Sequence, residues 1–381
     1  MEKKIVNNYG SFDVIFASGK GATLTDVDGK QYIDFVSGIG VNCLGHAHPK
    51  LVKAVQEQAA RQIHISNYYL SDVGLEFARK LLELTQFEGG FFGNSGAEAN
   101  EAAIKLARKY GYLNGGAGRK TIVTLQKSFH GRTIETLTAT GQDKFHPECF
   151  APYPATFKYI PANDYEAIQT AFDSSVCALM LECVQGEGGV NNLSPEFVKG
   201  IEKLCKEEDI VMIVDEVQTG NGRSGCFYSY QCFDVMPDVV TTAKGLAGGL
   251  PIGAVMLGER LKDVFGPGDH GSTFGGNPVA CAGAISIVNR IDDALLSDVK
   301  KKSEYIFSEM KGAEGVMEVT GLGLMIGIRP VKPAAEVIKY CMDNGVLCLS
   351  AKDKIRLLPA LNIPMELLEK GIAVIKAGCK A

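Results

Sequence analysis

The sequence lacks any apolar stretch long enough to cross a membrane. Its apolar runs, such as 178–181 and 322–328, are far shorter than the ~20 residues that a spanning helix needs. Lysine and arginine are scattered along the chain, so no basic patch for nucleic acid is expected. Residues 1–8 contain no apolar signal core. We therefore expect neither a membrane nor a nucleic acid as partner.

The sequence also lacks any C-x-x-C pair among its 11 cysteines. Neither a zinc site nor a redox motif is indicated, and no metal is expected. Most of the cysteines, Cys232 among them, lie in apolar segments where cysteine packs as a small hydrophobic side chain. An odd and dispersed set is typical of a reducing compartment, so the cytoplasm is the expected location.

What the chain does have is the composition of a globular protein. Hydrophobic residues make up 46% of its 381 residues, charged residues make up 22%, and the net charge is -5. Between about residues 90 and 290, short apolar runs alternate with helical patterns, which predicts an α/β fold with a mostly parallel sheet. The expected strands are 90–92, 121–125, 178–182, 211–215, 239–242 and 252–257, and the expected helices include 98–110 and 195–208.

The two ends of the chain have a different pattern. Residues 22–36 alternate in polarity about Asp28 and Gly29, which predicts a hairpin. Residues 316–381 mix strand patterns (323–328, 346–349 and 355–358) with two helices. We therefore predict a large α/β domain over residues 50–289 and a smaller α+β domain built from residues 1–49 and 290–381.

A glycine-containing turn leads from the predicted strand 90–92 into the predicted helix 98–110. Ser95 and Glu98 fit a capping box, and the free N–H groups of such a helix start can hold a phosphate. An ordinary capped helix is the alternative. The chain has neither a G-x-G-x-x-G motif nor a P-loop, so nucleotide binding is disfavoured.

An acidic pair, Asp215 and Glu216, ends the strand 211–215. The carboxyl ends of strands are where α/β sheets place their ligands. A carboxylate there can hold a pyridine nitrogen protonated, as a pyridoxal cofactor requires. The alternatives are a metal site, which no nearby histidine supports, and a solvated strand end.

Lys244 follows the apolar strand 239–242 and precedes several glycines. A buried lysine has a lowered pKa, and its amine forms a Schiff base with an aldehyde. The alternative is a surface lysine.

Two further segments extend this set. Phe129 could stack on a planar ring, and Arg132 suits a carboxylate. Ser272 and Thr273 add hydroxyl groups before another helix. Taken together, the segments supply phosphate donors, a ring-stacking side chain, a partner for a pyridinium nitrogen and a reactive amine.

With these motifs the chain resembles the class III aminotransferases, which are pyridoxal-phosphate-dependent enzymes of fold type I. The resemblance covers about residues 21–359 and is strongest in the stretches 37–42, 44–49, 94–108, 129–133, 185–189, 215–220, Lys244 and 271–278. It implies a large domain with a mixed, mostly parallel sheet, a smaller α+β domain, and a homodimer with its active site at the subunit interface.

The resemblance also implies roles for single residues. Lys244 would carry pyridoxal 5'-phosphate, and Asp215 would pair with its pyridine nitrogen. Gln218 would lie by the phenolic oxygen of the ring, and Val217 against the ring face opposite Phe129. The remaining residues of the implied cofactor site are Ser95, Gly96, Ala97, Glu182, Glu216 and, from the neighbouring subunit, Thr273.

Within the family, the resemblance is greatest to members that transfer the δ-amino group of N2-acetylornithine to 2-oxoglutarate. Asn42, Arg132 and Ser272 would then contact substrate. Arg356 would bind the carboxylate next to the reacting carbon of the keto acid, and Glu187 would mask Arg356 while the amino donor is bound.

Several alternatives stay open at this point. Relatives that act on succinylated donors, on ornithine or on 4-aminobutyrate share most of these motifs. A pyridoxal-phosphate-dependent aminomutase shares the fold but needs no keto-acid acceptor. A non-catalytic binding protein on the same fold would be expected to lack Lys244 or Asp215, and both are present.

Overall fold

A seven-stranded mixed sheet runs through the middle of the protein in the computed structural model, which describes residues 4–380; residues 1–3 and 381 lie outside the description. Its strands lie in the order β4-β12-β11-β10-β7-β5-β6. The pairs from β11 to β6 are parallel, and β12 is antiparallel to both β11 and β4. The bounds are β4 Gly89–Gly93, β5 Thr121–Leu125, β6 Phe157–Ile160, β7 Val176–Leu181, β10 Val211–Asp215, β11 Val239–Thr242 and β12 Gly253–Leu257.

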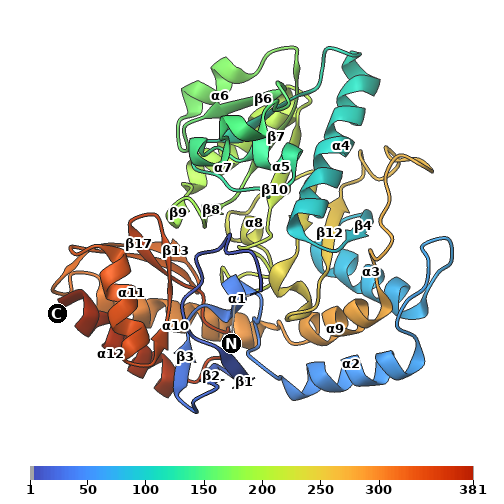
Figure 1. Ribbon diagram of the computed structural model, residues 1–381. Helices are drawn as coiled ribbons and strands as arrows, with labels where there is room; N and C mark the ends of the chain where they lie inside the picture. The colour runs from blue at the N-terminus through green and yellow to red at the C-terminus, as the bar shows by residue number, and fades with distance from the viewer. Residues whose placement is uncertain (1–3, 381) are drawn as a thin grey trace.

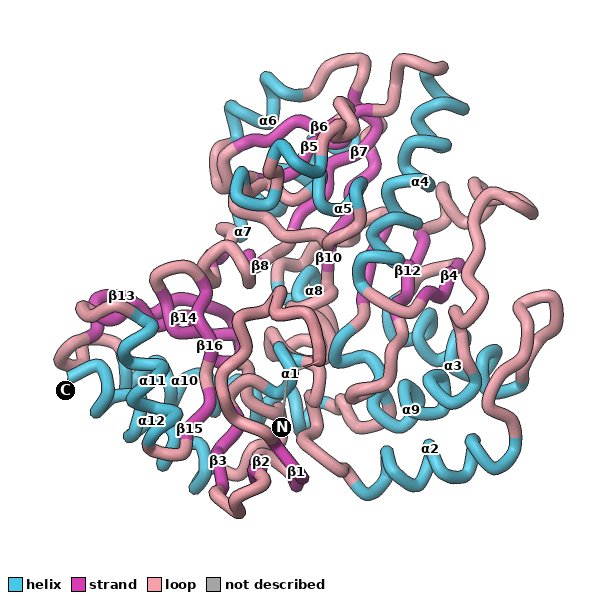
Figure 2. Tube along the Cα trace, viewed as in Figure 1, coloured by secondary structure: helices cyan, strands magenta, loops and turns pink. Residues whose placement is uncertain are grey.

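Helices cover both faces of this sheet, as Figure 2 shows. The helix α4 (Gly96–Gly115) packs against one face, where alternate strand residues such as Met180 and Ile213 join the alanines of α4. On the other face, Leu179 and Val214 join the core beneath α7 (Pro195–Glu207). Because successive side chains of a strand point to opposite faces, strands buried on both faces are apolar throughout. The other helices flanking this part are α2 Pro49–Arg61, α3 Asp72–Thr85, α5 Ile134–Ala139, α6 Tyr165–Ala171, α8 Ser229–Cys232 and α9 Pro278–Val288.

The two ends of the chain come together beside the large sheet (Figure 1). The strands β1 (Phe16–Lys20), β2 (Thr23–Asp26) and β3 (Gln31–Asp34) form a sheet in which β3 pairs in parallel with β15 (Val346–Leu347). A second sheet has the order β13-β14-β17-β16. Its bounds, and those of the helices beside it, are β13 Val316–Leu322, β14 Met325–Pro330, β16 Leu349–Ala351, β17 Lys354–Leu357, α10 Asp293–Met310, α11 Ala334–Asp343 and α12 Met365–Lys380.

The fold class expected from the sequence is confirmed. The strands 121–125, 211–215 and 239–242 have the predicted bounds, and the predicted hairpin is present as β2 and β3. The sequence patterns did not reveal β6 or β13. The division into residues 50–289 and the two chain ends stays a prediction. The short elements are α1 Ser37–Gly40, β8 Val184–Gln185 and β9 Asn191–Asn192.

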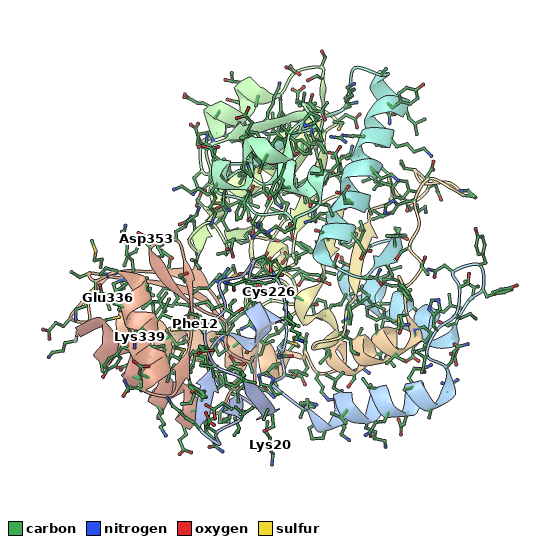
Figure 3. The ribbon with its side chains drawn as sticks, viewed as in Figure 1. Phe12, Lys20, Cys226, Glu336, Lys339 and Asp353 are labelled. Carbon is green, nitrogen blue, oxygen red and sulfur yellow. A yellow bond between two sulfur atoms is a disulfide. The ribbon has the colours of Figure 1, made fainter. Side chains whose placement is uncertain are left out.

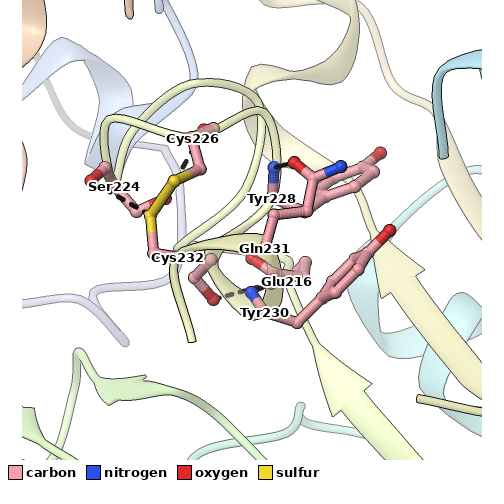
Figure 4. Close-up of a disulfide and its surroundings, with 8 residues drawn as sticks. Glu216, Ser224, Cys226, Tyr228, Tyr230, Gln231 and Cys232 are labelled. Carbon is pink, nitrogen blue, oxygen red and sulfur yellow. Dashed lines mark hydrogen bonds between the residues drawn. A yellow bond between two sulfur atoms is a disulfide. The ribbon is translucent and has the colours of Figure 1, made fainter. Parts of the chain in front are cut away.

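One cysteine pair corrects an expectation. Cys232 was expected to be a free hydrophobic side chain, but it forms a disulfide with Cys226 (Figure 4). The turn between the two cysteines brings their Cα atoms to 5.9 Å. Nine free cysteines are present among the described residues, and eight of them are buried. No helix within residues 4–380 has both the length and the apolar character that membrane crossing requires.

Candidate active site

A cavity of about 530 Å³ opens at the carboxyl ends of the central strands. Its walls come from the β4–α4 turn, the loop after β5, the end of β10 and the segment after β11. These segments are far apart in sequence, and the parallel strands bring their ends to one edge of the sheet. The residues predicted for the site that line this cavity are Ser95, Gly96, Ala97, Phe129, Arg132, Glu182, Asp215, Val217, Gln218 and Lys244.

The start of α4 forms one wall. The Ser95 hydroxyl accepts a hydrogen bond of 3.2 Å from the backbone N–H of Glu98, which confirms the Ser95 half of the predicted capping box. The Glu98 carboxylate instead accepts from the backbone N–H of Asn94. A Cβ atom at Gly96 would lie 2.6 Å from Cγ1 of Val217, so a larger residue would displace that side chain. The start of α4 thus packs closely against Val217. The free backbone N–H groups of such a helix start are suited to a phosphate group.

Asp215 lies on the floor of the cavity and is 3% exposed. Its Oδ2 accepts hydrogen bonds of 2.8 Å from Nδ2 of Asn100 and 2.8 Å from Nδ1 of His130. The backbone N–H of Val217 donates to its Oδ1 at 2.9 Å. Three donors thus orient the carboxylate.

Asn100 and His130 were not predicted to belong to the site. Asn100 also donates to the backbone carbonyl of His130 at 2.7 Å, so it ties α4 to the loop after β5. The sequence contained one signal for it, because Asn100 is a polar side chain on the otherwise alanine-rich face of a helix. A buried amide on such a face needs partners.

Glu182, at the end of β7, is 5% exposed and accepts a hydrogen bond of 2.9 Å from the backbone N–H of Phe129. Burial raises the pKa of this carboxyl to about 7, although the nearby His130 acts in the opposite direction. Glu182 therefore fixes the backbone that carries the Phe129 ring. That ring borders the cavity together with Val217.

Lys244 begins the short turn after β11, with a backbone φ of 43°. Such a left-handed conformation is unfavourable outside glycine and is found at functional sites. Within residues 4–380, no side chain forms a hydrogen bond or an ion pair with the Lys244 amine. Burial lowers the pKa of the amine to about 8, and the charge of Arg356 acts in the same direction. The amine therefore loses its proton near pH 8, well below the pH at which an exposed lysine does.

Two arginines lie near the cavity: Arg356 near the Lys244 amine and Arg132 over the Phe129 ring. Nη1 of Arg356 donates to Oε2 of Glu187 at 2.8 Å and to Oε1 of Gln218 at 3.3 Å. Arg356 is 3% exposed. Arg132 is exposed, and its guanidinium lies over the Phe129 ring at 5.4 Å from the centroid. The site therefore has two cations suited to carboxylates, one open to solvent and one covered by Glu187.

Six predicted residues are not among those that line the cavity, and two of them, Arg356 and Glu187, form the ion pair described above. Glu216 points away from it and accepts hydrogen bonds from Ser229 and Tyr230, as Figure 4 shows in part. Asn42 lines a neighbouring cavity of about 390 Å³. Ser272 and Thr273 line a third cavity, of about 560 Å³.

Comparison with known proteins identifies the class. The family described as Aminotransferase class-III matches residues 5–378. The chain therefore belongs to the class-III aminotransferases, which are pyridoxal-phosphate-dependent transaminases. It is 45% identical to an acetylornithine aminotransferase of Haemophilus ducreyi, over 97% of this chain and 95% of the relative. It is also 45% identical to the acetylornithine aminotransferase of Caldanaerobacter subterraneus, over 98% of this chain and 96% of the relative.

Solved structures agree with this assignment. The fold is similar to that of an ornithine aminotransferase of Toxoplasma gondii, with a TM-score of 0.95 and 30% identity over 99% of this chain and 92% of that one. It is also similar to the N-acetylornithine aminotransferase of Stenotrophomonas maltophilia, with a TM-score of 0.85 and 34% identity over 98% of this chain and 97% of that one.

The residues of the cavity fit pyridoxal phosphate. Lys244 offers an amine that forms no hydrogen bond or ion pair with residues 4–380, and Asp215 offers an oriented carboxylate for a pyridine nitrogen. Phe129 and Val217 border the space that a planar ring needs. Ser95, Gly96 and Ala97, at the start of α4, line the same cavity, and the backbone N–H groups of a helix N-terminus suit a phosphate group.

Proposed function

We propose that this chain is an acetylornithine aminotransferase. It transfers the δ-amino group of N2-acetylornithine to 2-oxoglutarate and forms N-acetylglutamate 5-semialdehyde and glutamate, a step of arginine biosynthesis. The ion pair between Arg356 and Glu187 beside Lys244 carries the proposal, because one site must accept two substrates with different charge patterns. The similarity to acetylornithine aminotransferases over nearly the whole chain supports it.

Pyridoxal phosphate, when bound, supplies an aldehyde that accepts an amino group and a ring that withdraws electrons. In the proposal Lys244 carries the cofactor and, once released, moves the proton at the reacting carbon of the substrate. Asp215 keeps the pyridine nitrogen protonated. The cofactor would also contact Gln218, the N-terminus of α4 and the ring of Phe129, whose backbone Glu182 holds in place.

The two arginines would divide the carboxylates of the substrates. The amino donor has its carboxylate several carbons from the reacting centre, where the exposed Arg132 can reach it, with Asn42 and Ser272 nearby in the assembled enzyme. The keto acid has a carboxylate next to the reacting carbon. Arg356 would bind that group after Glu187 releases it, because a buried bidentate arginine–carboxylate pair is strong.

We also propose that the enzyme is a homodimer, located in the cytoplasm, with its active site at the interface. The cavity that contains Thr273 is separate from the active-site cavity in one chain. The same region exposes large aromatic side chains, with Tyr68 96% and Phe274 59% exposed. A second subunit would cover them and could bring Thr273 to the cofactor phosphate of its partner.

The first experiment is a visible absorbance titration of the purified enzyme loaded with pyridoxal phosphate. N2-Acetylornithine should remove the band of the lysine-linked cofactor, and 2-oxoglutarate should restore it. Lys244→Ala should show no such band. A band that responds to ornithine, 4-aminobutyrate or a succinylated donor, but not to N2-acetylornithine, would overturn the substrate. Turnover without a keto acid would indicate an aminomutase.

The role of Glu187 has its own experiment. In Glu187→Ala the Arg356 guanidinium is always open, so donors with an α-carboxylate beside the amine should gain relative to δ-amine donors. The measurement is the ratio of kcat/KM for the two kinds of donor, with Glu196→Ala, an exposed residue of α7, as control. An unchanged ratio in Glu187→Ala would contradict the proposed gate.

A further inference from the structure

A fourth cavity, of about 550 Å³, lies between the loops that follow β5 and the turn between β16 and β17. Three lysines line it, each from a different segment. Lys127 follows β5, Lys144 lies in the short helix η1 (Asp143–Phe145), and Lys352 lies in the turn between β16 and β17. Figure 3 labels Asp353, the neighbour of Lys352, at the edge of the C-terminal part. The three ammonium groups thus converge from parts of the chain that are distant in sequence.

The positive charge of this cavity is not balanced by the protein. No ion pair involves Lys127, Lys144 or Lys352 in the part of the chain that the structure describes. Asp143 also lines the cavity, and the charge of Glu187, which is already paired with Arg356, reaches Lys352, so an excess of positive charge remains. Partial burial, followed by the charge of Lys144, lowers the pKa of Lys352. Like charges held close together destabilise the folded protein unless an anion binds between them.

Gln142 also lines the cavity, and its side chain has a buried acceptor atom without a partner among the described residues. Its side chain is 6% exposed, and its Nε2 donates to the backbone carbonyl of Ser128 at 2.9 Å and to that of Lys127 at 3.4 Å. These bonds fix which end of the amide is the oxygen. The Oε1 atom has no hydrogen-bond partner among the described residues. A buried acceptor without a donor is costly, so a ligand with a hydroxyl group would complete it.

The backbone of two of the lysines is strained. Lys127 has a φ of 67° and Lys352 a φ of 58°, although neither is glycine. The Lys127 carbonyl also packs closely on Gly188, where an added Cβ would collide with it. Strained backbone of this kind persists where the surrounding structure holds it and is concentrated at ligand sites.

We propose that this cavity is a binding site for a hydroxyl-bearing oxyanion of the hydrogen phosphate type, separate from the cofactor site. The three lysine ammonium groups bind its oxygens as point charges, and Gln142 Oε1 accepts its hydroxyl proton. A dicarboxylate such as succinate has the charge but no donor at neutral pH. The site therefore prefers phosphate to succinate.

The test is calorimetric titration of inorganic phosphate, and separately of succinate, into the enzyme loaded with its cofactor. Loading fills the cofactor's own phosphate site. Ionic strength is held constant with chloride. The variants are Lys144→Gln and Lys352→Gln, and the control is Lys301→Gln, an exposed lysine of α10 outside the cavity. Unfolding temperatures with and without phosphate give a second measurement.

Wild type and Lys301→Gln should bind phosphate saturably, and each cavity variant should bind about tenfold more weakly, the loss of one charged contact. Without phosphate, the cavity variants should unfold at a higher temperature than wild type, because a repulsion has been removed. Absence of saturable binding in wild type, or equal weakening in Lys301→Gln, would overturn the site. Equal affinity for succinate would overturn the ligand class.

Discussion

The buried amine of Lys244 should destabilise the cofactor-free protein, and its replacement by methionine measures by how much. Burial lowers the pKa of the amine from 10.5 to about 8. That difference corresponds to about 3 kcal/mol of free energy of unfolding. Water in the adjacent cavity screens part of this energy, so we expect Lys244→Met to gain about 2 kcal/mol at pH 7.

The sign of the pH dependence follows from proton binding. Below about pH 8 both the folded and the unfolded protein hold the Lys244 proton, and the full destabilisation is present. Between about pH 8 and 10.5 the folded protein has released the proton while the unfolded protein still holds it. Wild-type stability therefore rises with pH through this interval relative to Lys244→Met, and the advantage of the variant shrinks.

The assay is urea unfolding of both cofactor-free proteins at several values between pH 6 and pH 10. Lys302 gives a contrasting control, because its amine, also on a buried side chain, is 2.5 Å from Oδ2 of Asp298 and 3.0 Å from the Leu361 carbonyl. Lys302→Met should therefore lower stability. A Lys244→Met variant no more stable than wild type at pH 7, or equally stabilised at every pH, would refute the reasoning.

Two further predictions concern the walls of the site and the disulfide. Gly96→Ala should weaken cofactor binding by about tenfold or more, because its Cβ collides with Val217, and the added change Val217→Ala should restore part of the affinity measured by cofactor titration. Cys226→Ser should lower the free energy of unfolding by about 2 kcal/mol, the value expected for so short a loop. A reducing agent should produce the same loss in wild type and none in the variant; a loss in both would show that the bond between Cys226 and Cys232 is not its source.

The sequence predicted the strands that carry the site because their pattern is local. Strands that are buried on both faces of a sheet are mostly apolar; β10 has that pattern up to Asp215, and β5 and β11 combine apolar residues with buried threonines. Two of the missed strands, β6 and β13, lack it. The edge strand β6 has only one buried residue, and β13 has none that is fully buried and a bulge between Val316 and Glu318. Partly exposed edge strands resemble loops in sequence.

The sequence by itself determined which segments carry phosphate donors, a ring-stacking aromatic, an acidic strand end and a reactive lysine, since each depends on neighbours along the chain. Only the tertiary structure showed that Asp215 and Glu216 have different surroundings. A single step along the backbone turns a side chain to the other side, so one carboxylate faces the cavity and the other faces Ser229 and Tyr230.

The tertiary structure also decided the partners across the sheet edge; the family resemblance had implied that Glu187 masks Arg356, but nothing in the sequence analysis had paired Asn100 with Asp215. Asn100 donates a hydrogen bond to Asp215, 115 residues away in the sequence, and Arg356 donates one to Glu187, 169 residues away. No local pattern encodes such pairs, because they depend on how helices and strands pack. The packing of the C-terminal sheet against the central sheet places Arg356 beside Lys244 and brings Glu187 against Arg356.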